Sequence, residues 1–340
     1  MRQGLLLAFW LLAVAFLPVK AQEGDALDLP AALFVLTNEG RVDRYGLGSE
    51  GIRAVTPQSA FVLDFGVAPD GDWLAYRTET LLALRRVSNG EGVTLDEGGA
   101  SVPSVRGQGD TIAWSPGGDA IAVTTLEGGR VYLGSGPNPF TNAANVVALD
   151  LAEGAFYQFA WSPDGRYLAG EVADNVWWIY RRDGNTLSLT SAITSSVGVA
   201  WASGFEIAFA PLEGGLYLMN LDNANAQTTL LDDTWNYFLP ALADDGLLKF
   251  FGRQKDDPVI TEGFGRLLGL AAGTPAVQNL SEVAIELNGL QWAPRGHLMI
   301  ALRNSTLILL DPVTGNAFTL PIANAVAYDW GVPPVETGNS

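Results

Sequence analysis

Hydrophobic and polar positions alternate along residues 157–170, YQFAWSPDGRYLAG, in the pattern of a β-hairpin. The two flanks, residues 157–161 and 166–170, have the two-residue period of strands. The four residues between them suit a type I turn followed by a glycine bulge, because Pro163 presets φ and Gly165 accepts a positive φ. This turn fixes the register of the hairpin and therefore which face is buried.

Degraded copies of this hairpin recur along the chain. We define the anchor position of a copy as the last residue of its first strand, which is Trp161 in the hairpin above. The successive anchors are Val67, Trp114, Trp161, Trp201, Leu242, Trp292 and Trp330, the fourth copy being shortened and the last truncated. They lie 38 to 50 residues apart, a spacing typical of four-stranded propeller blades, and the strand alternation excludes helical repeats of similar period.

The two ends of the chain complete each other. Residues 33–37, 41–47 and 52–56 form the second to fourth strands of a unit without a first strand, whereas residues 325–330 form a first strand with nothing after it. Pairing these segments closes a ring and removes two open sheet edges. The sequence therefore predicts an all-β, seven-bladed propeller of four-stranded antiparallel blades, closed by pairing of the C-terminal strand with the N-terminal strands.

The first 21 residues do not fit this repeat. Arg2 precedes an apolar run at residues 5–17, and Val19 and Ala21 occupy the positions that a signal peptidase reads. We expect a signal peptide at residues 1–21, a propeller at 22–335 and a short tail at 336–340. An uncleaved anchor is the alternative, but the apolar run is shorter than the roughly 20 residues that span a bilayer. We therefore expect an exported protein, periplasmic or extracellular, without stable membrane insertion.

Charge and cysteine content narrow the function. The chain has 19 Lys and Arg against 37 Asp and Glu, a net charge of −18, and no cysteine. An acidic surface repels phosphate backbones and anionic lipids, so nucleic acid is excluded as a partner. Without disulfides, stability outside the cytoplasm must come from the core.

The WSPDG turn at residues 161–165, followed by small apolar pairs such as Leu168-Ala169 and Leu74-Ala75, resembles the repeat of TolB-like propellers, periplasmic relatives of the WD-repeat class. The resemblance covers essentially the whole chain after residue 21 and implies a bacterial β-propeller. TolB carries an α/β domain ahead of its propeller, and residues 22–33 leave no room for one. The resemblance therefore implies the fold and not a role with envelope-spanning partners.

Most catalytic chemistry is absent from the sequence. No serine lies in a GxSxG elbow, and the single histidine, His297, follows a turn where sister copies carry Arg166 or Asp72. A peptidase, a lyase with several histidine ligands, and cysteine or zinc sites are excluded. Carboxylates remain, but no EF-hand spacing is present. We expect no cofactor, with calcium bound by acidic loops as an open alternative.

Two long connections, residues 98–110 and 253–264, map to the rim that carries the connections between blades. Adjacent Trp177 and Trp178 are expected to be packing residues, since neighbouring blades cover both faces of a blade. The candidate binding residues on the rim are Trp235, Asp232, Asp233, Arg106, Arg253, Asp256, Asp257 and Glu262.

Two classes of function stay open. The first is a non-catalytic exported module whose partner is an envelope or extracellular protein, a peptide or a glycan. The second is an enzyme that uses carboxylates alone, of the glycosidase or calcium-assisted lactonase type, which needs two acids facing each other at the channel mouth. The positions of buried acids around the channel distinguish the two.

Overall fold

The computed structural model describes residues 29–97, 111–125, 128–136, 140–173, 175–195, 198–222, 227–243, 246–254, 263–271, 277–287, 289–294 and 298–332. The expected signal peptide, the tail and His297 lie outside these ranges. In the part of the chain that is described, no helix is long and apolar enough to cross a membrane.

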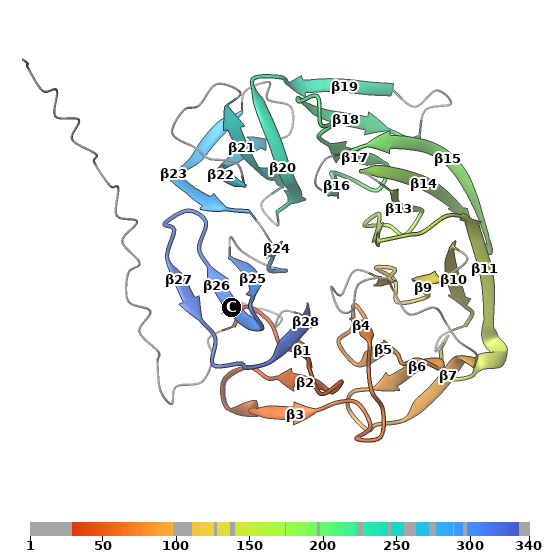
Figure 1. The fold of residues 1–340 in the computed structure, drawn as a ribbon. Coiled ribbons are helices and arrows are strands. Elements are labelled where there is room, and N and C mark those ends of the chain that lie inside the picture. The colour runs from red at the N-terminus through yellow and green to blue at the C-terminus, as the bar shows by residue number, and fades with distance from the viewer. Residues whose placement is uncertain are drawn as a thin grey trace, which may run out of the picture.

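The described strands form seven four-stranded antiparallel sheets arranged as blades around a central channel (Figure 1). The first three blades contain these strands: blade 1, β28 (Ala325–Trp330), β1 (Leu33–Thr37), β2 (Val42–Tyr45) and β3 (Ile52–Ala54); blade 2, β4 (Asp64–Val67), β5 (Trp73–Arg77), β6 (Leu81–Arg86) and β7 (Gly92–Glu97); blade 3, β8 (Ile112–Trp114), β9 (Ala120–Thr125), β10 (Gly128–Gly134) and β11 (Val146–Glu153).

The other four blades follow in chain order: blade 4, β12 (Gln158–Trp161), β13 (Tyr167–Ala173), β14 (Val176–Asp183) and β15 (Thr186–Thr194); blade 5, β16 (Val199–Trp201), β17 (Glu206–Phe209), β18 (Leu216–Asn220) and β19 (Gln227–Asp232); blade 6, β20 (Trp235–Leu242), β21 (Leu247–Gln254), β22 (Phe264–Ala271) and β23 (Gln278–Glu286); blade 7, β24 (Leu290–Trp292), β25 (Met299–Arg303), β26 (Thr306–Leu310) and β27 (Ala317–Thr319). Two short 3-10 helices, η1 (Gly48–Glu50) and η2 (Ala143–Asn145), lie in connections. Every predicted anchor ends an inner strand, so the predicted blade count is confirmed.

Blade 1 is built from both ends of the chain, as predicted. Strand β28 pairs antiparallel with β1, from Leu33 opposite Trp330 to Thr37 opposite Ala325, with a register shift after Leu36. Backbone hydrogen bonds thus replace the two open edges that separate strands would present.

The hairpin turns follow the predicted geometry. Gly165 has φ 70°, and the matching Gly71, Gly118 and Gly246 have φ between 66° and 75°. The hydroxyl of Ser162 donates to Asp164 at 2.8 Å and accepts the backbone N–H of Tyr167 at 2.9 Å. These bonds close the turn between the first two strands of a blade. We call the edge of the ring that carries these turns the hairpin rim, and the other edge the connection rim.

Each junction between adjacent blades has its own hydrophobic cluster. Seven such clusters of buried residues occur in the described chain. On β1, for example, Leu33 and Val35 face blade 7 while Phe34 and Leu36 face blade 2. The expectation for the paired tryptophans holds as well, because Trp177 is 2% exposed and Trp178 packs edge-on against Phe156. Strand alternation therefore places each side chain at a particular junction.

Candidate functional site

The structure describes four of the eight residues predicted to form a binding surface on the connection rim. They are Asp232, Asp233, Trp235 and Arg253; the other four, Arg106, Asp256, Asp257 and Glu262, lie outside the described residues. Asp232 ends β19 and Trp235 begins β20, and Arg253 lies opposite Asn236 in the β20–β21 pair. The fold therefore brings the described members to the connection rim where blades 5 and 6 meet.

Internal contacts occupy two of these side chains. Asp232 accepts hydrogen bonds from the Thr234 backbone and hydroxyl and from the Tyr237 hydroxyl. Burial opposes ionisation of Asp232, but these hydrogen bonds keep its pKa below the usual value. Trp235 is half-buried against the cluster between blades 5 and 6, where a Cβ on Gly252 would lie 3.2 Å from its ring. The role of this rim in binding stays a prediction.

The anchors of the inner strands share a contact that joins adjacent blades. The indole N–H of a tryptophan anchor donates to a backbone carbonyl on the inner strand of the preceding blade. The four bonds run from Trp114 to Gly66, from Trp161 to Ala113, from Trp201 to Ala160 and from Trp292 to Leu239, at 3.0 to 3.2 Å. In the first three, the accepting residue immediately precedes an anchor and is Gly or Ala, which leaves room for the indole.

The junction between blades 1 and 2 departs from this arrangement. The anchor of blade 2 is Val67, and the residue that precedes the anchor of blade 1 is Asp329. The donor and acceptor groups differ here: the backbone N–H of Val67, not an indole, donates to a side-chain carboxylate, Asp329 Oδ2, at 2.7 Å. An acid therefore stands where the regular junctions have Gly or Ala, and a valine stands where they have tryptophan.

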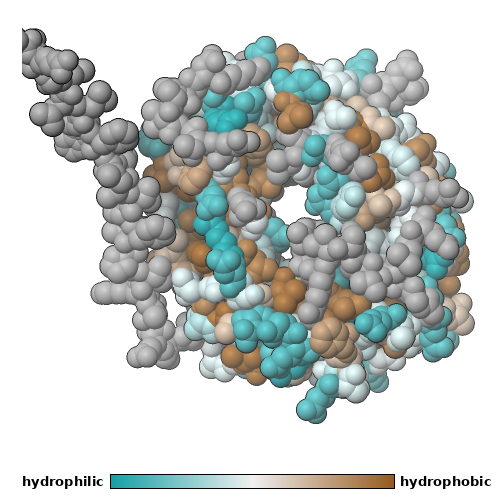
Figure 2. Space-filling model, in the orientation of Figure 1, coloured by the Kyte–Doolittle hydropathy of each residue, from teal (hydrophilic) through white to brown (hydrophobic). Residues whose placement is uncertain are grey.

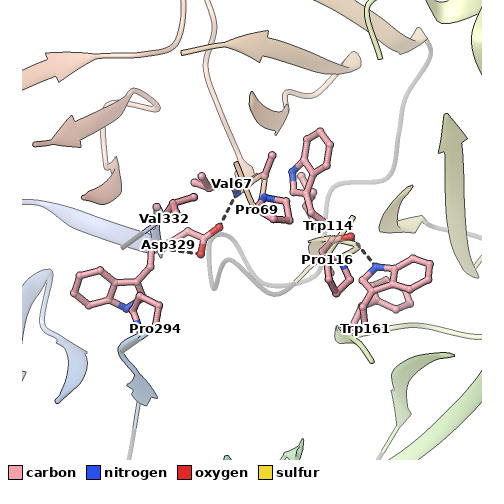
Figure 3. Close-up of a pocket in the computed structure, with 14 residues that line it drawn as sticks. Val67, Pro69, Trp114, Pro116, Trp161, Pro294, Asp329 and Val332 are labelled. Atoms are coloured by element: carbon pink, nitrogen blue, oxygen red, sulfur yellow. Dashed lines mark hydrogen bonds between the residues drawn. The ribbon is translucent and has the colours of Figure 1, made fainter. Parts of the chain in front are cut away.

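A pocket of about 440 Å³ opens beside Asp329 at the mouth of the central channel, on the hairpin rim (Figure 3). Figure 2 shows an opening at the centre of the ring. Aromatic, aliphatic and proline residues supply the other walls, among them Phe159, Trp114, Trp161, Pro69, Pro116 and Pro294. Asp329 is the only ionisable side chain among the described residues that line the pocket.

Asp329 is half-buried, since its carboxylate adjoins the pocket and protein surrounds it elsewhere. Burial raises its pKa to about 7, although the N–H groups of Val67 and Trp330 favour the charged form, and the Asp64 carboxylate raises it further. Asp64 is fully buried opposite Arg77, and the Arg77 guanidinium donates to the Thr124 carbonyl at 2.7 Å. A raised carboxyl pKa in a pocket marks a candidate functional site.

A second hollow of about 510 Å³ adjoins the first on the same rim. It is lined by Arg44, Glu50, Arg53, Asp70, Gly71, Asp72, Val87 and Ser88. The two hollows are neighbours because Pro69 lines the first and Asp70 the second, while a Cβ on Gly71 would meet Val332 of the first at 3.3 Å. Arg44 pairs with Glu50 at 2.7 Å, so some charges of the outer hollow are already matched.

The sequence contained a signal for this pocket that the prediction did not use. Val67 was recognised as an anchor where most copies have tryptophan, and Asp329 interrupts the apolar strand AVAYDW. The candidate binding residues predicted from the sequence all map to the other rim. For metals, the described residues contain no group of three or more His, Cys, Asp or Glu side chains placed to hold an ion.

No protein-family model and no curated protein matches the sequence. Solved structures with the same fold do match. A functionally unknown protein from Desulfotomaculum acetoxidans has a TM-score of 0.61 at 12% identity, covering 89% of this chain and 100% of that one. The C-terminal WD40 domain of Sif2 has a TM-score of 0.50 at 13% identity, covering 75% and 71%.

TolB from Acinetobacter baumannii is also among the structural neighbours, with a TM-score of 0.47 at 13% identity, covering 90% of this chain and 67% of that one. A candidate 6-phosphogluconolactonase from Bacteroides uniformis has a TM-score of 0.53 at 14% identity, covering 88% and 98%. The neighbours thus include a WD40 domain and a candidate enzyme. At these identities the likeness shows the fold alone, and the chain is a seven-bladed β-propeller.

Proposed function

We propose that this chain is an exported, non-catalytic propeller that binds an extended segment of a protein or peptide on its hairpin rim. The observation that carries the proposal is the pair of adjoining hollows that meet at the Pro69–Asp70 step. A small molecule fits within one pocket, whereas an extended segment contacts both. The apolar run near the N-terminus supports export.

The geometry of the pocket favours binding over catalysis. An enzyme that works with acids alone requires two carboxylates facing the substrate, one to donate a proton and one to attack or to activate water. Among the described lining residues only Asp329 is a carboxylic acid, and Asp64 is fully buried and does not line the pocket. One acid without a second group facing it supports recognition of a ligand.

A matched pair of variants tests the proposal. Replacing Val67 by Trp and Asp329 by Ala in one chain reproduces the regular junction of Trp161 with Ala113, and fills the pocket without removing a strand. We expect this double variant to melt cooperatively and to lose the partner that residues 22–340 of the wild-type chain capture from an envelope extract, as measured by quantitative mass spectrometry.

Trp235→Ala serves as the control on the connection rim, where the surface predicted from the sequence lies. If the double variant retains every partner that the wild type captures, the hairpin rim is not the binding surface. If Trp235→Ala, folded and cooperative, loses the partner instead, the connection rim is the binding surface and the sequence-based prediction holds.

A further inference from the structure

We infer that the pocket at the channel mouth receives a lysine or arginine side chain of the bound segment, paired with the Asp329 carboxylate. This inference rests on the proposed function, because it names the chemistry of the group that enters the pocket.

The charge pattern of the pocket is the first argument. No described lining residue is cationic, and Asp329 is the only ionisable one. Burial makes the lone carboxylate costly to ionise, and a cation that enters removes this cost by forming a charge-assisted hydrogen bond. The overall charge of −18 attracts cations and repels anions before contact.

The walls provide the second argument, because two of their three indole donors are already used and the third, on Trp330, is buried. The indole N–H groups of Trp114 and Trp161 donate to carbonyls of the preceding strands. The backbone N–H groups of Val67 and Trp330 donate to Asp329 itself. An anionic or hydroxyl-rich ligand would find few free donors here, whereas these aromatic and proline walls suit the apolar stem of a long basic side chain.

The ligands that the described walls offer favour a basic side chain over a metal ion. A metal ion takes several oxygen or nitrogen ligands, and the described walls offer a single carboxylate. A basic side chain needs only that one partner at its tip, and aromatic surface around it adds cation–π attraction. The adjoining outer hollow gives the rest of a peptide a place to lie, which a free amine does not use.

Blocked tripeptides test the inference on the chain starting at residue 22. The probes are acetyl-Gly-Lys-Gly-amide, the same peptide with norleucine, which keeps the stem and lacks the charge, and the same peptide with glutamate. We expect the lysine peptide to bind about tenfold or more tightly than the norleucine peptide in titrations followed by the indole N–H signals in NMR spectra.

Asp329→Asn is the matched variant, because an asparagine oxygen can still accept the Val67 N–H while the charge is lost. We expect it to remove the preference for lysine over norleucine. For the wild type the preference should grow from pH 6 to pH 8 as Asp329 ionises. Its charged neighbours are Asp64 on β4 and Arg77, which lies opposite Asp64 on β5. For the variant the preference should not change with pH.

Each other outcome overturns the inference. Three results would contradict recognition of a basic side chain. They are equal binding of the lysine and norleucine peptides, a preference for the glutamate peptide, and an unchanged preference for lysine in Asp329→Asn. Equal affinity of n-butylammonium and the lysine peptide assigns the pocket to a free amine. In these cases loss of the captured partner in the Val67→Trp, Asp329→Ala chain still supports the proposed function, so the two proposals fail separately.

Discussion

Two junctions of the same ring both border the pocket but differ in the contact that joins their blades. Between blades 3 and 4, Trp161 lies over Ala113 and donates its indole N–H to the Ala113 carbonyl at 3.1 Å. Between blades 1 and 2, the corresponding residues are Val67 and Asp329, and the bond is made by the Asp329 carboxylate. The anchor of blade 2 is small, and the acid places a charge beside the pocket.

The comparison also separates stability from function. The regular junction satisfies its indole donor, as a core should. The exceptional junction holds a carboxyl group whose pKa burial raises to about 7, which destabilises the folded protein at neutral pH. A site that departs from the local rule at a cost in stability is where function is expected.

The largest effect is expected from removing the strand that supplies Asp329. A chain that ends at Ile322 lacks β28 and leaves the inner edge of β1 unpaired. We expect it to aggregate or to lose its cooperative thermal transition in circular dichroism, because blade 1 loses its inner strand.

The control is removal of residues 336–340, which takes away no described strand and should leave the melting temperature unchanged. A chain ending at Ile322 that melts cooperatively at the wild-type temperature would contradict the role assigned to β28 in closing the ring.

An effect of intermediate size is expected from Asp329→Asn. A carboxyl with a higher pKa in the folded than in the unfolded protein binds its proton more tightly when folded, so stability falls as the pH rises from about 4 to about 7 and is constant above. The asparagine variant lacks this loss. At pH 8 we expect it to be more stable than the wild type by about 2 to 4 kcal/mol, with little difference near pH 4.

Urea denaturation of both chains at pH 4.5, 6 and 8 measures the prediction. The informative quantity is the difference between variant and wild type, because other titrating groups cancel in it. A difference that is constant across the three pH values would show that Asp329 ionises in the folded protein as it does in the unfolded one.

The sequence was sufficient to predict the ring but not its exceptional junction. Turn glycines and strand alternation recur in each blade, so the seven anchors and the pairing of β28 with β1 followed from local patterns. The two-residue period tells which residues share a face, but not which carbonyl an indole will reach. The bulge in β20, where Leu239 has φ 49° and accepts the Trp292 indole, has no counterpart in the repeat pattern.

The candidate site shows the same limit. Trp235 follows a link between blades and is a candidate for binding on that ground. It is half-buried against the cluster between blades 5 and 6, close to Gly252, and only the three-dimensional register reveals this packing. Asp329 was visible in the sequence as an acid in an apolar strand. Its meaning depends on Val67, which lies 262 residues away.

The smallest expected effect compares two tryptophan anchors that differ in the fate of the indole N–H. Trp161 donates to Ala113, whereas the Trp330 indole nitrogen is buried and has no acceptor among the described residues. Phenylalanine retains most of the aromatic surface and removes the donor in both cases. Trp161→Phe leaves the Ala113 carbonyl without its partner, while Trp330→Phe removes a donor that was unsatisfied, so we expect the first to cost about 1 to 2 kcal/mol more than the second in urea denaturation. Both substitutions remove the same atoms, but Trp161 is the more buried of the two rings, so its loss of packing also adds to the expected difference. Equal costs would therefore mean that the indole bonds joining the blades add nothing beyond packing.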